Sequence, residues 1–435
     1  MLTDAIRLAR GLRRNLELSR DELEAIQRRK LGSLLRHAWE NVPYYRDLFT
    51  AAGARPGDIR GAEDLAALPA TSKGALQAQP PERILAGVID PARTVSDVTS
   101  GSTGIPLRVR FTREDYMVRS LVFVRTFMAA GYRLTDRQAI VCDTRFSSGT
   151  IRWFQRLGFL RKRYIPVQVD LDRQIDLLRE YRPDHIHGYP QSLALVAGEL
   201  IRKGIDDISP RILHTGAELV TGKTRSLINS AFRVDMLDTY ASIESGLIAW
   251  ECGSHRGYHV NMDCTVMEIL ANGRPARPGE RGRAVVTNLH SYAMPIIRYE
   301  LGDVCLPSDG TCPCGSHFPL LGIVEGRVDD MVRTPVGRVL SPNSLTNAME
   351  AVDGISQFRI VQKALDVLQV LIVAGNGFSP DTPVAVHRIL GELVGEGMRI
   401  DVNVVDEIPR ELTGKIRAVI SEIPETHSTE MRSGR

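Results

Sequence analysis

Residues 99–104 form the segment of this chain best suited to binding an anion. Glycine adopts backbone angles closed to other residues, so successive N–H groups can face one concavity, and hydroxyl groups add further donors. The run therefore predicts a polyphosphate site in a nucleotide-dependent enzyme, although composition alone leaves a flexible surface loop as an equal alternative. All six residues are small: Thr99, Ser100, Gly101, Ser102, Thr103 and Gly104.

Strand-like residues flank this loop on both sides, at 94–98 and at 106–111. The P-loop of many NTPases leads instead into a helix and ends in Gly-Lys-Ser/Thr. We therefore expect a turn between two strands, which disfavours a P-loop NTPase.

Two acidic residues stand where they can serve a bound nucleotide. Glu244 can ligate Mg²⁺, which prefers one or two carboxylates together with phosphate oxygens, and Tyr240 can stack on a base. A helix start with Ser242 as its N-cap explains the same stretch. Asp303 follows Gly302 at an expected strand end, where a carboxylate can accept both hydroxyls of a ribose, although a simple turn has the same sequence.

One lysine near the C-terminus is a candidate for charge stabilisation. Lys415 ends a loop of residues 409–415. A lysine presented by a movable loop can neutralise charge on a transferring phosphoryl group. A loop lysine considered alone is more often simply solvated.

Cysteines and a histidine in two short segments indicate a metal site. Cys252 and His255 form a Cys-x-x-His pair, and Cys312 and Cys314 form a Cys-x-Cys pair. Three thiolates and one imidazole make the closed tetrahedral set of a structural Zn²⁺ site. Free buried cysteines are the alternative, and two nearby cysteines can replace one ligand.

These side chains must be positioned by a chain that alternates between strands and helices. Residues 1–50 show helical periodicity, which Pro43 ends. The alternation after residue 95 favours an α/β fold with helices packed on sheets, and strands of antiparallel character follow at 260–310. A small α+β unit follows a polar break at 326–342. The expected strands are 139–141, 185–187, 234–237, 284–286, 358–362, 368–373 and 401–405, and the expected helices are 170–181, 192–203, 342–352 and 382–396.

The composition excludes several other classes of protein. The 435 residues are 43% hydrophobic and 25% charged, as in soluble globular proteins, and their net charge is only +3. Without a dense basic run, nucleic acid is not an expected partner. No apolar run approaches the roughly 18 residues that span a bilayer, and the N-terminus lacks a secretion signal, so we expect a cytoplasmic protein.

Taken together and in this order, the motifs resemble the adenylate-forming superfamily, which includes acyl-CoA synthetases, peptide-synthetase adenylation domains and luciferases. Within it the chain is most similar to the phenylacetate-CoA ligase and CapK-like branch. Three further stretches carry this likeness, which extends over nearly the whole chain: 41–46 (Asn-Val-Pro-Tyr-Tyr-Arg), 68–73 (Leu-Pro-Ala-Thr-Ser-Lys) and 188–190 (Gly-Tyr-Pro).

The resemblance implies a fold and a domain organisation. It implies a large α/β N-terminal adenylation domain over residues 1–326, made of sheets flanked by helices with a β-rich subdomain. A small, mobile α+β domain follows over residues 327–435, with the hinge near Asp329.

The resemblance also implies a role for each motif. The loop 99–104 binds the β- and γ-phosphates of ATP, residues 216–218 (Gly216, Ala217 and Glu218) pack on adenine, and Tyr240 lies beside the nucleotide. Glu244 ligates Mg²⁺. Asp303 binds the ribose, and Arg327 lies near it. Lys415 contacts the substrate carboxylate and the α-phosphate. Relatives carry a similar zinc site, and many have a lysine where this chain has Ile105.

The implied activity is that of an AMP-forming acid–thiol ligase that uses ATP, Mg²⁺ and coenzyme A, with an aryl or arylacetic acid as substrate. Adenylation with another acceptor stays open: a carrier-protein thiol, an amine, or a cofactor hydroxyl as in deazaflavin-adenylating relatives. An inactive, zinc-stapled nucleotide-binding scaffold is the alternative from another class. Relatives also make a homodimer an expectation.

Overall fold

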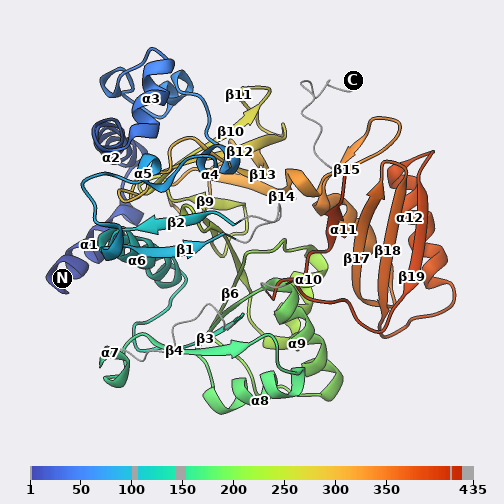
Figure 1. The fold of residues 1–435 in the computed structure, drawn as a ribbon. Helices are drawn as coiled ribbons and strands as arrows, with labels where there is room; N and C mark the ends of the chain where they lie inside the picture. The colour runs from blue at the N-terminus through green and yellow to red at the C-terminus, as the bar shows by residue number, and fades with distance from the viewer. Residues whose placement is uncertain (1, 100–105, 144–152, 412–413, 424–435) are drawn as a thin grey trace. The chain divides into compact units, whose positions relative to one another are not determined.

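The computed structural model describes all of the chain except residue 1 and residues 100–105, 144–152, 412–413 and 424–435 (Figure 1). The residues pack into two compact units. Unit 1 consists of Met1–Tyr132, Thr239–Leu301 and Cys305–Ile323. Unit 2 consists of Arg133–Asp238, Gly302–Val304 and Val324–Arg435.

Three helices of unit 1, α2, α4 and α6, begin at a side-chain cap that the sequence supplies. Ser19 starts α2 with a capping box, in which its N–H donates to the Glu22 carboxylate at 2.9 Å. Pro43 follows the end of α2, as predicted, and also opens α3 in the position where its missing N–H costs no hydrogen bond. The helical elements are α1 (Leu2–Arg14), η1 (Asn15–Glu17), α2 (Arg20–Asn41), α3 (Pro43–Ala51), η2 (Pro56–Asp58), η3 (Glu63–Ala67), α4 (Lys73–Gln77), α5 (Pro81–Ile84), η4 (Pro91–Arg93) and α6 (Arg113–Ala129).

The strands of unit 1 are antiparallel in the pairs β1–β2, β7–β8, β8–β9, β9–β14, β10–β11 and β10–β12. Apolar side chains of α2 and α3 pack with Val266, Leu289 and Ile297 in one buried cluster. The strands are β1 (Val95–Val98), β2 (Arg108–Phe111), β8 (Gly246–Glu251), β9 (Tyr258–Val260), β10 (Thr265–Ala271), β11 (Arg274–Pro275) and β12 (Gly282–Asn288), with parts of β7 (Leu237–Ser242), β13 (Tyr299–Pro307) and β14 (Leu320–Arg327).

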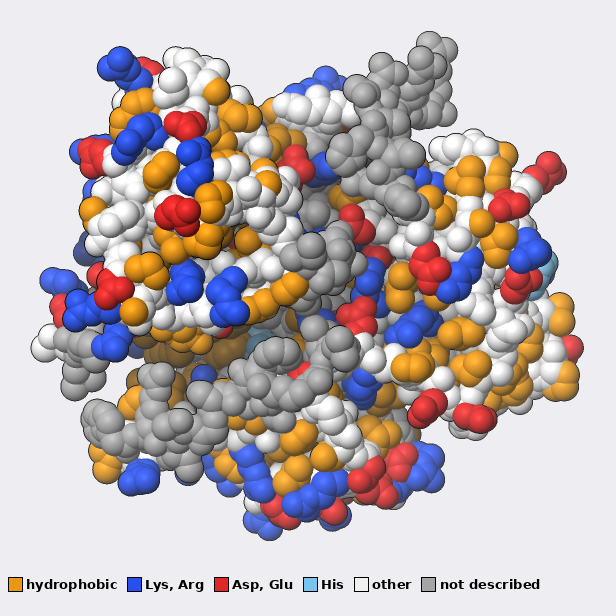
Figure 2. Space-filling view, viewed as in Figure 1, with side chains coloured by type: hydrophobic (Ala, Val, Ile, Leu, Met, Phe, Trp, Pro, Cys, Tyr) orange, Lys and Arg blue, Asp and Glu red, His pale blue; other side chains and the backbone are white. Residues whose placement is uncertain are grey.

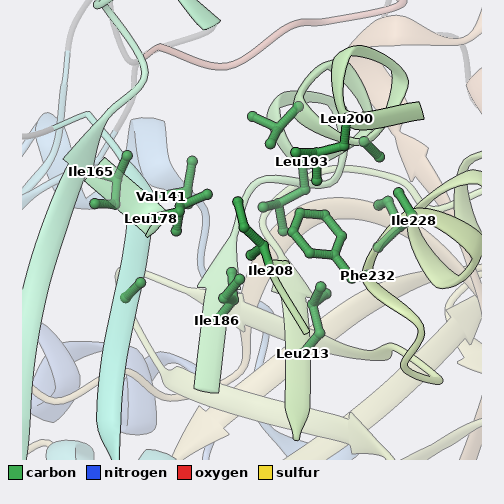
Figure 3. Packing of buried hydrophobic residues seen from close by; sticks show 14 of the residues in the cluster. Val141, Ile165, Leu178, Ile186, Leu193, Leu200, Ile208, Leu213, Ile228 and Phe232 are labelled. Atoms are coloured by element: carbon green, nitrogen blue, oxygen red, sulfur yellow. The ribbon is translucent and has the colours of Figure 1, made fainter. Parts of the chain in front are cut away.

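Four parallel strands organise the first part of unit 2, in the order β6-β5-β3-β4. Because the strands are parallel, their carboxyl ends share one edge, where α/β proteins bind ligands. Helices α8, α9 and α10 cover one face, and their apolar side chains meet those of the strands in the core shown in Figure 3. The elements are β3 (Arg137–Cys142), α7 (Trp153–Arg156), β4 (Arg161–Pro166), α8 (Leu171–Tyr181), β5 (His185–Gly188), α9 (Pro190–Lys203), β6 (Ile212–Gly216) and α10 (Gly222–Phe232).

The C-terminal part of unit 2 is a four-stranded sheet in the order β19-β18-β17-β20, packed against α11 and α12 (Figure 1). Its core contains apolar residues from both helices and from all four strands. The elements are η6 (Val328–Asp330), β15 (Val332–Arg333), β16 (Val339–Leu340), α11 (Pro342–Glu350), β17 (Ile355–Ala364), β18 (Val367–Ala374), α12 (Thr382–Val394), β19 (Arg399–Val404) and β20 (Val419–Ser421).

The predicted mixture of α/β and α+β structure is confirmed, with one misplaced strand. Residues 234–237 were expected to form a strand, but β7 begins only at Leu237. Val234 and Met236 are apolar because they pack into the core beside α10. None of the described helices has both the length and the apolar character needed to cross a membrane. Basic and acidic side chains are interspersed on the face shown in Figure 2, in keeping with the small net charge.

Candidate functional site

The carboxyl edge of the parallel strands in unit 2 carries the segment predicted to contact adenine. β6 ends at Gly216, and Ala217 follows with a φ of 73°, which turns the chain sharply at a residue that rarely adopts this conformation. β5 ends at Gly188, where an added Cβ would lie 2.9 Å from Val141 of β3. Glycine at this position therefore allows the two strands to approach closely.

Asp303 and Arg327, both predicted to lie near the ribose, form an ion pair in unit 2. Arg327 Nη1 lies 3.5 Å from Asp303 Oδ1, and its Nη2 lies 3.5 Å from Asp329 Oδ2. Asp303 lies inside β13, and not at a strand end as predicted. Gly302 before it has a φ of 77°, and an added Cβ would lie 2.8 Å from Arg327 Nη2. Gly302 thus gives the guanidinium room to lie against the strand.

Lys415 lies in the same charged cluster. Burial lowers the pKa of its ammonium group, whereas Glu218, Glu411 and Asp303 act in the opposite direction. Its Nζ is 5.8 Å from the centre of the Tyr189 ring, within the range of a cation–π contact. The structure therefore brings together four of the predicted residues of unit 2, the Lys415 ammonium, the Asp303 carboxylate, the Arg327 guanidinium and the Glu218 carboxylate.

The Glu218 side chain contacts the backbone of the Lys415 loop. One carboxylate oxygen accepts the N–H of Ile416 at 2.8 Å, and the other accepts the N–H of Gln191 at 3.1 Å. Burial raises the pKa of Glu218 to about 7, although these hydrogen bonds and the nearby Lys415 and Arg410 lower it in part. Sequence reasoning placed Glu218 beside adenine and missed both contacts.

In unit 1, the carboxylate of Glu244 is buried and held in place. Its Oε1 accepts the hydroxyl of Tyr299 at 2.9 Å. The turn that carries it joins the antiparallel strands β7 and β8, so the alternative of a helix starting at Ser242 is wrong. Ser242 Oγ does accept the N–H of Ser245, at 3.0 Å, but it caps a hairpin. Arg119 lies beneath the turn and donates to the Ile243 carbonyl.

The base of the candidate phosphate loop is a β-hairpin, as predicted. β1 and β2 pair in antiparallel fashion, and Thr99 N donates to the Leu107 carbonyl at 2.9 Å. The Thr99 hydroxyl accepts the N–H of Leu107, also at 2.9 Å. Residues 100–104 and Ile105 lie outside the described residues.

A cluster of three cysteines and one histidine in unit 1 can hold a metal ion. The ligand atoms of Cys252, His259, Cys312 and Cys314 lie within 4.8 Å of one another. His259 Nε2 is 3.4 Å from both Cys252 Sγ and Cys314 Sγ, and Cys252 Sγ is 3.5 Å from Cys312 Sγ. A tetrahedron with zinc–sulphur bonds of about 2.3 Å has edges of about 3.8 Å, so the donor set fits.

The histidine of this cluster differs from the one predicted. His255 lies in the turn between β8 and β9, with its Nδ1 3.7 Å from Glu251. His259 pairs with Trp250 across the two strands, which brings its ring back toward Cys252. Burial lowers the pKa of His259 and so favours the neutral form that a metal requires. The register of the β8–β9 hairpin decides which histidine joins the cluster, and the local Cys-x-x-His spacing does not reveal that register.

Comparison with known proteins identifies a matching family model and several similar sequences. Residues 332–422 match the family model of the CapK C-terminal domain. The phenylacetate-coenzyme A ligase of Thermus thermophilus is 30% identical over 325 residues, and that of Aromatoleum evansii is 31% identical over 326 residues. Each alignment covers 72% of this chain and 72% of the relative.

Solved structures share the fold. A 2-hydroxyisobutyryl-CoA ligase in the postadenylation state, in complex with 2-HIB-AMP, matches with a TM-score of 0.78 at 21% identity. This match covers 94% of the present chain and 91% of that chain. With relatives of this similarity over most of its length, the chain belongs to the phenylacetate-coenzyme A ligase branch of the adenylate-forming superfamily.

Proposed function

We propose that this protein uses ATP to convert a carboxylic acid, of the aryl or arylacetic class, into an acyl-adenylate and then into a thioester of coenzyme A. Membership of the family supports this activity, and the names of the relatives support the acid class. The structural observation that carries the proposal is the charged cluster of unit 2, in which Lys415 lies near Asp303 and Arg327.

The two steps make different demands on this cluster. In the first, an oxygen of the substrate carboxylate attacks the α-phosphorus of ATP, and pyrophosphate leaves. Lys415 would stabilise the negative charge of the substrate carboxylate and of the α-phosphate, while Asp303 and Arg327 would orient the ribose. In the second, the thiolate of coenzyme A attacks the acyl carbonyl, and AMP leaves.

The remaining nucleotide contacts are assigned from the family motifs. Glu244, fixed by Tyr299, would ligate the Mg²⁺ that neutralises phosphate charge. Residues 99–104 would bind the β- and γ-phosphates. Residues 216–218 and Tyr240 would contact the adenine.

We also propose that the cluster of Cys252, His259, Cys312 and Cys314 binds a structural Zn²⁺ ion. The donor distances support this, and four protein ligands fill the coordination sphere of a structural site. The ion would connect the β8–β9 hairpin to a loop about 60 residues later, as the sequence separation of Cys252 and Cys312 shows.

The small C-terminal domain is proposed to move between the two steps. Rotation near Asp329 would withdraw Lys415 and admit the thiol, a hinge motion in which few residues change their backbone angles. In support, Asp329 lies in the short helix η6, just before the region that matches the CapK domain. The homodimer and the cytoplasmic location stay predictions.

Pyrophosphate release tests the activity directly. The protein is supplied with ATP, Mg²⁺ and a panel of carboxylic acids, with and without coenzyme A. Release that needs an acid and yields an acyl-CoA supports the proposal. Acyl-adenylate without thioester points to another acceptor, such as a carrier thiol, an amine or a cofactor hydroxyl. The absence of release with every acid points to an inactive scaffold.

Replacing Lys415 separates the two steps. The Lys415→Ala variant is expected to lose adenylate formation by at least about 100-fold, because a charge stabilised only in that step contributes several kcal/mol. Thioester formation from supplied acyl-adenylate should stay close to the wild-type rate. An equal loss of both half-reactions would contradict the role of Lys415.

A further inference from the structure

Glu218 connects three segments of unit 2 that are far apart in sequence. The residue follows β6, its two oxygens accept the backbone N–H groups of Gln191 and Ile416, and Ile416 is 198 residues away. Gln191 is the second residue of α9, where N–H groups have no acceptor within the helix and the helix end is positive. Both oxygens of the carboxylate are therefore engaged by donors.

The described residues on either side of 412–413 bond to one another and pack on the same segments. Glu411 N donates to the Lys415 carbonyl at 2.9 Å, and Gly414 N donates to the Glu411 carbonyl at 2.8 Å. Arg410 Nη1 donates to Ser192 Oγ in α9 at 2.8 Å and to the Gly414 carbonyl at 3.1 Å. The Arg410 side chain thus contacts the first turn of α9 directly, and Glu218 connects the Ile416 backbone to the same turn.

Gly414 shows how closely the loop packs. Its φ is 76°, and an added Cβ would lie 2.7 Å from Val167 Cγ2 and 3.3 Å from Asp143 Cβ. Val167 and Asp143 directly follow β4 and β3, so the loop rests on the carboxyl edge of the parallel strands. Only glycine fits without displacing this edge or the loop.

We propose that Glu218 is a positioning residue that holds the Lys415 loop in place for adenylate formation. The Ile416 N–H belongs to the peptide group that joins Lys415 to Ile416, and consecutive Cα atoms are only about 3.8 Å apart. A hydrogen bond to this N–H therefore fixes the backbone of Lys415. Because Glu218 binds main-chain groups, it acts whatever side chain stands at 416. This inference rests on the proposed function, which gives Lys415 its role. That function also requires the hydrogen bond between Glu218 and Ile416 to break when Lys415 withdraws.

A second acidic contact provides the matched control. Glu350 at the end of α11 accepts hydrogen bonds from Thr221 and Thr224, which lie at the start of α10. Like Glu218, it is a carboxylate that joins the C-terminal part of unit 2 to the parallel-sheet part. It lies 65 residues from Lys415 along the chain, and its carboxylate bonds to α10 and not to α9 or to the described residues of 410–416.

The first arm of the test measures hydrogen exchange at the Ile416 amide, resolved to single residues, in the full-length protein. Glu218→Ala is expected to reduce protection of this amide by about 10- to 100-fold, the size of one hydrogen bond to a charged acceptor. Glu218→Gln, which keeps one acceptor oxygen, should show an intermediate loss. Glu350→Gln should leave the amide protected. Unchanged protection in Glu218→Ala would overturn the proposal.

The second arm measures the two half-reactions separately. At saturating ATP and saturating acyl-adenylate, where any weaker contact with adenine no longer limits the rate, Glu218→Ala should slow acid-dependent ATP–pyrophosphate exchange by at least tenfold and leave thioester formation within about twofold. An equal fall in both would show a merely structural role and would also overturn the proposal. If the wild-type protein shows no pyrophosphate exchange with any acid, the proposed function fails, and the amide measurement alone then decides the Glu218 contact.

Discussion

Substituting Gly414 with alanine is expected to impair adenylate formation and to spare thioester formation. The added methyl group would meet Val167 at 2.7 Å and Asp143 at 3.3 Å, at a residue whose φ is 76°. These contacts exist only while the Lys415 loop rests on the edge of the parallel strands. A loop that has moved away is free to relax both the overlap and the backbone.

The size of the effect follows from two contributions. A non-glycine residue in the left-handed region costs roughly 1–2 kcal/mol. Extra methyl groups in a packed site cost about 1–3 kcal/mol. Together they disfavour the docked loop by about 2–5 kcal/mol, and because about 1.4 kcal/mol is a factor of ten, its population should fall at least about 30-fold.

Acid-dependent ATP–pyrophosphate exchange measures the first half-reaction, and thioester formation from supplied acyl-adenylate measures the second. Gly377→Ala is the matched control, because Gly377 also has a positive φ, of 82°, but an added Cβ meets nothing within 4 Å. The control should lose some thermal stability and keep the ratio of the two rates. Wild-type pyrophosphate exchange in Gly414→Ala, or an equal fall of both rates, would refute the reasoning.

Three further predictions concern the ribose contact, the metal cluster and pH. Asp303→Asn should raise the KM for ATP about 10- to 100-fold, since a hydrogen bond to a charged group contributes about 1.5–3 kcal/mol; an unchanged KM would argue against the ribose role. Cys252→Ser should lower both the zinc content measured by elemental analysis and the Tm, whereas Cys142→Ser, outside the cluster, should keep the wild-type zinc content; equal zinc in both variants would count against the site. Burial, with a smaller effect of His187, lowers the pKa of His214 to about 3. A histidine in the unfolded chain has a pKa near 6.5, so below that pH the unfolded state binds a proton that folded His214 does not. The free energy of unfolding therefore falls between about pH 6.5 and 3, by a His214 contribution on the order of 5 kcal/mol. Denaturant unfolding of His214→Gln should show a shallower acid decline than the wild type, and identical slopes would rule this out.

The elements that follow local rules were predictable from the sequence. Helix α8 starts after Asp170, whose side chain accepts the Arg173 N–H at 2.8 Å, and the expected helix at 170–181 matches it closely. The C-terminal strands and helices were also found, because their apolar positions alternate with a clear period. The misplaced strand at 234–237 shows the limit of reading strands from apolar residues. Met236 is apolar because it packs in the core beside a helix, and it belongs to no strand.

Parts of the candidate site depend on contacts between distant segments, which sequence periodicity does not encode. His259 lies near the three cysteines because β9 folds back on β8. Its sequence spacing from Cys252 does not predict this contact unless the register of the two strands is known. Glu218 belongs to a motif that the sequence does reveal. The hydrogen bond between Glu218 and Ile416 depends on how the C-terminal loop lies on α9. No local sequence pattern near either residue predicts that contact.

The three thiols of the cluster of Cys252, His259, Cys312 and Cys314 have a consequence for the protein's sensitivity to oxygen. Cys252 Sγ and Cys312 Sγ lie 3.5 Å apart, and Cys314 is exposed. Bound zinc would keep these thiolates engaged as ligands, whereas thiols without metal are open to attack and oxidation. A disulfide between Cys252 and Cys312 would then need only a modest approach of two sulphur atoms. Chelation followed by exposure to air would therefore turn reversible metal loss into a covalent modification that added zinc alone does not undo.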